Sequence, residues 1–115
     1  MFTAYVVVTL LTIAANAFAA TLDFVRYKQV LINAAKVGVP ESWLTMLGIL
    51  KAAGAVGLLL GLLGVPLIGT AAAIGLILFF VGAITTHLRA RDHSLAFPSA
   101  FLLLAVAALV LDLAS

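Results

Sequence analysis

The 115-residue chain has no cysteine and few charged residues. The absence of cysteine excludes disulfide bonds, thiol redox chemistry and cysteine-ligated metal sites. Charged residues make up 9% of the chain, whereas about 25% is usual for a soluble domain. The two histidines, His87 and His93, are not spaced to act as paired ligands on one helical face. The composition therefore argues against a soluble domain, and we expect no metal site.

Hydrophobic residues make up 66% of the chain and fall into four long runs. The runs predict helices at about residues 3–22, 43–64, 67–88 and 95–113. A helix of ~20 residues, rising ~1.5 Å per residue, crosses the ~30 Å hydrocarbon core of a bilayer. The runs show no apolar–polar alternation of the kind that barrel strands need, so helices are expected. The sequence predicts an all-α, four-transmembrane-helix bundle that forms a single transmembrane domain over residues 1–115.

The connection between the first two runs mixes charged and apolar residues. Its apolar residues recur with a helical spacing at Phe24, Tyr27, Leu31 and Ala34. This spacing predicts a short amphipathic segment at the membrane interface. A continuation of the first helix beyond the bilayer would show the same spacing, so both interpretations stay open.

The basic residues of the connections predict the orientation of the chain. The first connection contains Arg26, Lys28 and Lys36, and the third contains Arg89 and Arg91. Short loops rich in Lys and Arg stay on the cytoplasmic side of a membrane. We therefore expect loops 23–42 and 88–95 in the cytoplasm and both termini outside. Basic residues distributed in this way do not predict a nucleic-acid partner.

Four glycines mark one face of the second predicted helix: Gly54, Gly57, Gly61 and Gly64. Small residues at this spacing let two membrane helices approach closely. The stripe predicts helix packing, either against a neighbour inside the bundle or against another subunit.

Polar residues within the predicted spans are the candidates for a site. Tyr5, Thr9, Thr12, Asn16 and Asp23 share one face of the first helix, and Lys51 and His87 lie in the second and third. A lysine at mid-membrane costs ~2.5–3.5 kcal/mol, which snorkelling or an ion pair with Asp23 would relieve. The buried amide of Asn16 needs a hydrogen-bond partner.

Asn16, Asp23, Lys51 and His87 are all expected in the cytoplasmic half of the bilayer. Because they lie at a similar depth, we predict that they form one polar pocket. Such a pocket would bind a ligand or respond to protons, since histidine titrates near neutral pH. Structural pairing of the charges and an interfacial His87 would explain the same residues without any ligand. No catalytic constellation of residues is visible, and no cofactor is predicted.

Several stretches are similar to the DoxX-like family of small four-helix bacterial membrane proteins. They are residues 37–43 (VGVPESW), 48–54 (GILKAAG) and 79–92 (FFVGAITTHLRARD), with Asn16 and Phe18. The resemblance implies a location in the bacterial inner membrane and a bundle like that of vitamin K epoxide reductase. The name-giving subunit belongs to a thiosulfate:quinone oxidoreductase, and a related animal branch includes receptor chaperones. Because this chain lacks every cysteine of the reductase pattern, a link to quinone is expected only as ligand binding.

Three functions follow, in order of preference. The first is a non-enzymatic accessory, assembly or chaperone-like subunit in the lipid bilayer, with a membrane protein partner or a homo-oligomer both open. The second is a bundle that binds a quinone, a lipid or a small anion in the cytoplasmic polar pocket. An oligomeric transporter ranks below both.

Overall fold

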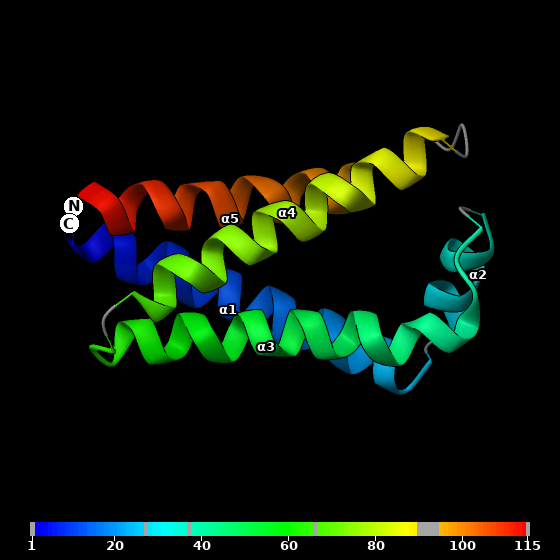
Figure 1. Cartoon of the computed structure of the whole chain (residues 1–115), viewed down its shortest axis with the longest axis horizontal. Coiled ribbons are helices and arrows are strands. Elements are labelled where there is room, and N and C mark those ends of the chain that lie inside the picture. The colour runs from blue at the N-terminus through cyan, green and yellow to red at the C-terminus, as the bar shows by residue number, and fades with distance from the viewer. Residues whose placement is uncertain (1, 27, 37, 66, 90–94, 115) are drawn as a thin grey trace.

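The described residues of the chain form four long helices and two short helical segments (Figure 1). A computed structural model describes residues 2–26, 28–36, 38–65, 67–89 and 95–114. The elements are α1 (Phe2–Phe24), α2 (Lys28–Lys36), the 3-10 turn η1 (Glu41–Trp43), α3 (Leu44–Leu62), α4 (Ile68–Arg89) and α5 (Ala96–Ala114). Every element of the described residues is helical, which confirms the predicted all-α class.

The four long helices form an elongated bundle. Neighbouring helices are α1 and α3, α3 and α4, α4 and α5, and α5 and α1. Both termini lie at one end together with the α3–α4 turn, whereas α2 lies at the other end (Figure 1). The bundle is 40 Å long, enough to cross the ~30 Å core of a bilayer. By length and composition α1, α3 and α4 are candidate membrane spans, and α5 contains a shorter apolar segment, Pro98–Ala114.

The connection between α1 and α3 contains a separate short helix. Arg26 has a φ of +51°, a left-handed conformation that a continuous α-helix cannot contain. The α2 helix is therefore not an extension of α1, which excludes the second of the two interpretations, and the location of α2 at the membrane interface stays a prediction. Tyr27, part of the predicted amphipathic spacing, and residues 90–94 of the predicted loop 88–95 lie outside the described residues.

The second predicted helix is shorter than expected because a tight turn replaces its last residues. The α3 helix ends at Leu62 rather than at residue 64. Gly64 has a φ of +101°, which glycine adopts without the clash that a Cβ atom would cause. The turn returns the chain at once into α4, so α3 and α4 pack as an antiparallel pair.

Three glycines of α3 face α4 inside the bundle. A Cβ atom at Gly54, Gly57 and Gly61 would lie 2.5, 2.7 and 2.6 Å from atoms of Leu76, Ala72 and Gly69, respectively. A methyl group at any of these positions would force α4 atoms to move, and at Gly61 the atom that it meets belongs to the backbone. Glycine therefore lets the two helices approach closely. Gly64 is not part of this contact, because it lies in the turn and a Cβ atom there would meet nothing within 4 Å.

The interior of the bundle is apolar on three helices and polar on the fourth. The apolar core comprises Leu58, Ala73, Leu76, Phe80 and Ala105, from α3, α4 and α5. The buried residues of α1 are instead Thr9, Thr12, Asn16, Ala20 and Asp23. They recur every three or four residues, so they form one helical face. The opposite face of α1 exposes apolar side chains such as Leu11 and Phe18, as expected for a helix that meets lipid.

Candidate functional site

Asp23 and Lys51 form an ion pair inside the bundle, between the end of α1 and the first half of α3. Lys51 Nζ lies 2.9 Å from Asp23 Oδ2. The side chains are 15% and 5% exposed, respectively. The ammonium group also lies 5.6 Å from the centre of the Phe79 ring, within the range of a cation–π contact. Each charge therefore has a partner, and the pair presents little net charge to a ligand.

Asn16 lies deeper on the same face of α1 and is fully buried. Its amide nitrogen donates to the Thr12 backbone oxygen of its own helix at 2.9 Å. Its other polar atom, Oδ1, has no hydrogen-bond partner among the described residues, and neither has Thr9 Oγ1. A buried polar atom without a partner costs about 1–3 kcal/mol. The interior of α1 therefore offers an amide oxygen and a hydroxyl group without hydrogen-bond partners in the described part of the chain, within about two turns of helix.

Thr12 lies between these two atoms and connects α1 to α5. Its hydroxyl lies 2.8 Å from the Val8 backbone oxygen of its own helix and 3.3 Å from that of Leu104 in α5. A threonine hydroxyl has a single hydrogen, so the two oxygens share it. The contact with α5 is thus the longer and weaker of the two.

His87 bonds to its own helix. Its Nδ1 atom lies 2.8 Å from the Ala83 backbone oxygen, and since a carbonyl only accepts, this nitrogen carries the proton. No hydrogen bond or ion pair within the described part of the chain joins His87 to Asn16, Asp23 or Lys51. The structure thus brings Asp23 and Lys51 together, places Asn16 about two turns further along α1, and leaves His87 in the last turn of α4.

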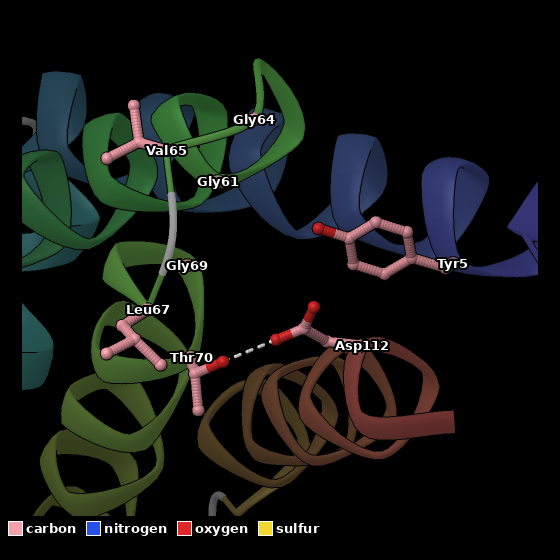
Figure 2. A pocket seen from close by; sticks show the side chains of 8 residues that line it. All are labelled: Tyr5, Gly61, Gly64, Val65, Leu67, Gly69, Thr70 and Asp112. Atoms are coloured by element: carbon pink, nitrogen blue, oxygen red, sulfur yellow. Dashed lines mark hydrogen bonds between the residues drawn. The ribbon is translucent and has the colours of Figure 1, made fainter. Parts of the chain in front are cut away.

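A second polar cluster lies at the end of the bundle that holds both termini. The hydroxyl of Thr70 in α4 donates to Asp112 Oδ2 in α5 at 2.6 Å. Tyr5 of α1 completes the group, and the three side chains point toward a common space (Figure 2). This space, here called the terminal cavity, has a volume of about 210 Å³. Its lining residues are Tyr5, Gly61, Gly64, Val65, Leu67, Gly69, Thr70 and Asp112.

Sequence reasoning missed the terminal cavity, although one signal was available. Asp112 is an acidic residue in the last turn of an apolar helix, where the negative end of the helix dipole disfavours a carboxylate. Such an unfavourable position requires an explanation from the fold. The two partners could not be found from sequence, because Thr70 and Tyr5 lie on other helices.

The described residues do not resemble a metal centre. No group of three or more His, Cys, Asp or Glu among them could hold a metal ion. The chemistry that these residues can perform is hydrogen bonding and charge pairing, at the Asp23–Lys51 pair, at the amide oxygen and hydroxyl group of α1 and in the terminal cavity.

Comparison with known proteins assigns the family. No curated protein and no solved structure matches the chain. The model of the DoxX-like family matches residues 7–108, which include all of α3 and α4, most of α1 and α5, and the Asp23–Lys51 pair. A match over nearly the whole length, in a chain with apolar helices long enough to cross a bilayer, shows that this protein is a multi-pass membrane protein of the DoxX-like family.

Proposed function

We propose that this protein is a non-enzymatic accessory or assembly subunit that binds another membrane protein through α4. The observation that carries the proposal is the contrast between the glycines of α3 and those of α4. A Cβ atom at Gly75 or Gly82 would meet nothing within 4 Å, and both residues are exposed. They are two helical turns apart, so they lie on one face, together with Leu78, which is 67% exposed.

An outward face with glycines suits a partner helix better than it suits lipid alone. Membrane helices associate through close packing at small residues, because lipid tails are as apolar as leucine. Inside the bundle Asp23 and Lys51 neutralise each other, which leaves little charge there for an anionic substrate. We place the protein in the bacterial inner membrane, with both termini outside and loops 23–42 and 88–95 in the cytoplasm, because of the basic residues in these loops.

Purification of the tagged full chain from native membranes in a mild detergent tests the proposal. We expect a partner membrane protein in stoichiometric amount. The double variant Gly75→Leu/Gly82→Leu should lose the partner while it retains a wild-type thermal unfolding midpoint. Ala53→Leu adds apolar bulk at an exposed position of α3 instead and should retain the partner. Recovery of a homo-oligomer alone, or equal recovery of the partner with both variants, would contradict the proposal.

A second candidate function is binding of a ligand against α1, and the amide oxygen and hydroxyl group described above favour it. Asn16 Oδ1 needs a hydrogen-bond donor, whereas the Thr9 hydroxyl can donate or accept. A quinol or the hydroxyl groups of a lipid supply a donor for Asn16 Oδ1, whereas a quinone has only acceptors and would leave this oxygen without a partner. A small anion would also bring only acceptors and would have to compete with Asp23 for Lys51.

Extraction of the purified protein with organic solvent tests this second function. Mass spectrometry should find a quinol or a lipid in about equimolar amount, and Asn16→Leu, which replaces the amide with an apolar group of similar size, should remove it. If Asn16→Leu retains the extracted molecule, α1 does not bind it.

A further inference from the structure

We propose that the terminal cavity binds an organic ammonium group, which the carboxylate of Asp112 attracts. The Thr70 hydroxyl occupies one oxygen of this carboxylate, Oδ2. The described residues provide no hydrogen bond to the other oxygen, Oδ1, which lies on the side chain that points into the cavity (Figure 2). A carboxylate can accept about four hydrogen bonds, so most of its capacity is unused.

The charges around the cavity favour a positive ligand. None of the residues that line it is Lys, Arg or His. Lys51 is the basic residue of α3, and it lies ten residues before Gly61, about 15 Å along the helix. Thr70 lies in the first turn of α4, whose positive dipole end favours Asp112, but Asp112 itself lies in the last turn of α5, whose negative end disfavours it. The two helix ends oppose each other, and no basic side chain within residues 2–26, 38–65, 67–89 or 95–114 forms an ion pair with this carboxylate.

The donor set fits an ammonium group better than a metal ion. A primary ammonium group donates three hydrogen bonds, which the free oxygen of Asp112 and the hydroxyl oxygens of Tyr5 and Thr70 can accept. The Tyr5 ring adds a cation–π surface. A calcium ion takes about six to eight oxygen ligands, usually from several carboxylates, whereas the cavity offers one carboxylate. Asp112, Tyr5 and Thr70 thus provide three hydrogen-bond acceptors for the three N–H groups of a primary ammonium ion.

The size and position of the cavity suit the head group of a lipid or a free alkylammonium ion. Its volume of about 210 Å³ is far larger than the ~10–15 Å³ that a cavity needs to hold one water molecule. It is smaller than the ~300 Å³ at which pockets for drug-sized molecules begin. The adjoining turn exposes apolar side chains, with Leu63 at 73% and Leu67 at 82%. The bundle is 40 Å long and the hydrocarbon core of a bilayer is ~30 Å thick, so the end of the bundle that holds the cavity lies near the head groups.

Native mass spectrometry of the detergent-solubilised full chain tests the proposal. The probes are phosphatidylethanolamine, which carries a primary ammonium group, phosphatidylglycerol, which has none, and free ethanolamine. We expect phosphatidylethanolamine or ethanolamine to bind more tightly than phosphatidylglycerol. Asp112→Asn should weaken this binding by about tenfold to a hundredfold, the effect expected for a charge-assisted hydrogen bond. Thr85→Val changes an exposed threonine of α4 whose hydroxyl bonds to its own helix and should leave binding unchanged.

The arms of the experiment separate the sources of the ammonium group. Retention of phosphatidylethanolamine that ethanolamine displaces would assign the cavity to a lipid head group, and binding of ethanolamine alone would assign it to a soluble amine. Equal binding of phosphatidylglycerol, or binding of the amine that does not weaken as the sodium chloride concentration is raised, would overturn the proposal, because an interaction between opposite charges is screened by salt. If Asp112→Asn does not fold, Tyr5→Phe replaces it, and unchanged affinity in that variant would overturn the proposal too.

Discussion

Removal of the positive charge of Lys51 should destabilise the bundle strongly. Lys51→Met retains most of the length of the side chain but leaves the carboxylate of Asp23 without its partner. That side chain is only 5% exposed, so water cannot replace the ammonium group. Loss of one partner of a buried ion pair costs about 3–5 kcal/mol. The cation–π contact with Phe79 contributes little to this figure, because a methionine sulfur also packs well on an aromatic ring.

Unfolding by sodium dodecyl sulfate in mixed micelles, followed by circular dichroism, measures the effect. Lys51→Met should unfold at a clearly lower detergent fraction than the wild type. The double variant Asp23→Leu/Lys51→Met should recover most of the lost free energy, because two apolar side chains replace a buried ion pair at about equal stability. A coupling free energy below about 0.5 kcal/mol in this double-mutant cycle would refute the reasoning. Such a small coupling free energy would mean that the Lys51 ammonium group extends to the head-group layer and does not pair with Asp23.

Three further variants test the packing of the bundle, with the same unfolding assay. Gly61→Ala should cost about 1–3 kcal/mol, because its methyl group meets the backbone of α4 and cannot be accommodated by a side-chain rotation; Gly75→Ala, which meets open space, is the matched control and should not destabilise. Gly64→Ala should cost about 1–2 kcal/mol through its left-handed φ of +101°, and wild-type stability would contradict the turn. Thr12→Val should cost only about 0.6 kcal/mol, the average for an interhelical hydrogen bond in a membrane protein, since its contact with Leu104 is long; a loss above ~2 kcal/mol would mean that the hydroxyl has another role.

Much of the fold could be predicted because membrane helices are defined by local sequence. Each long helix begins and ends within a few residues of the predicted limits, since length and hydropathy are properties of one segment at a time. The polar face of α1 could be predicted for the same reason. Thr9, Thr12, Asn16 and Asp23 share a face of any α-helix, and a polar face turns away from lipid.

The contact between α3 and α4 shows what the glycine spacing could predict and what it could not. The spacing of Gly54, Gly57 and Gly61 predicted a close helix contact, but it left open whether the partner was inside the bundle or in another subunit. The same pattern included Gly64, which instead ends the helix. Periodicity identifies a face, whereas the turn that follows depends on the backbone conformation of a single residue.

The candidate site was harder to predict because it depends on contacts between helices. A salt bridge between Asp23 and Lys51 could be considered from their similar depth, yet the same argument placed His87 with them. The structure shows instead that the His87 ring bonds to its own backbone. Depth along the membrane normal constrains one coordinate of a side chain, and the rotation of each helix supplies the others.

The sequence by itself determined that this protein is all helical, how many long apolar helices it has, and that polar residues lie on one face of the first. These are local properties, because each helix satisfies its own backbone hydrogen bonds. Only the tertiary structure decided which charges meet, which polar atoms on α1 have no hydrogen-bond partner among the described residues, and that Tyr5, Thr70 and Asp112 line a common open pocket. Such outcomes depend on how separate helices rotate and pack against one another, which no single segment of sequence specifies.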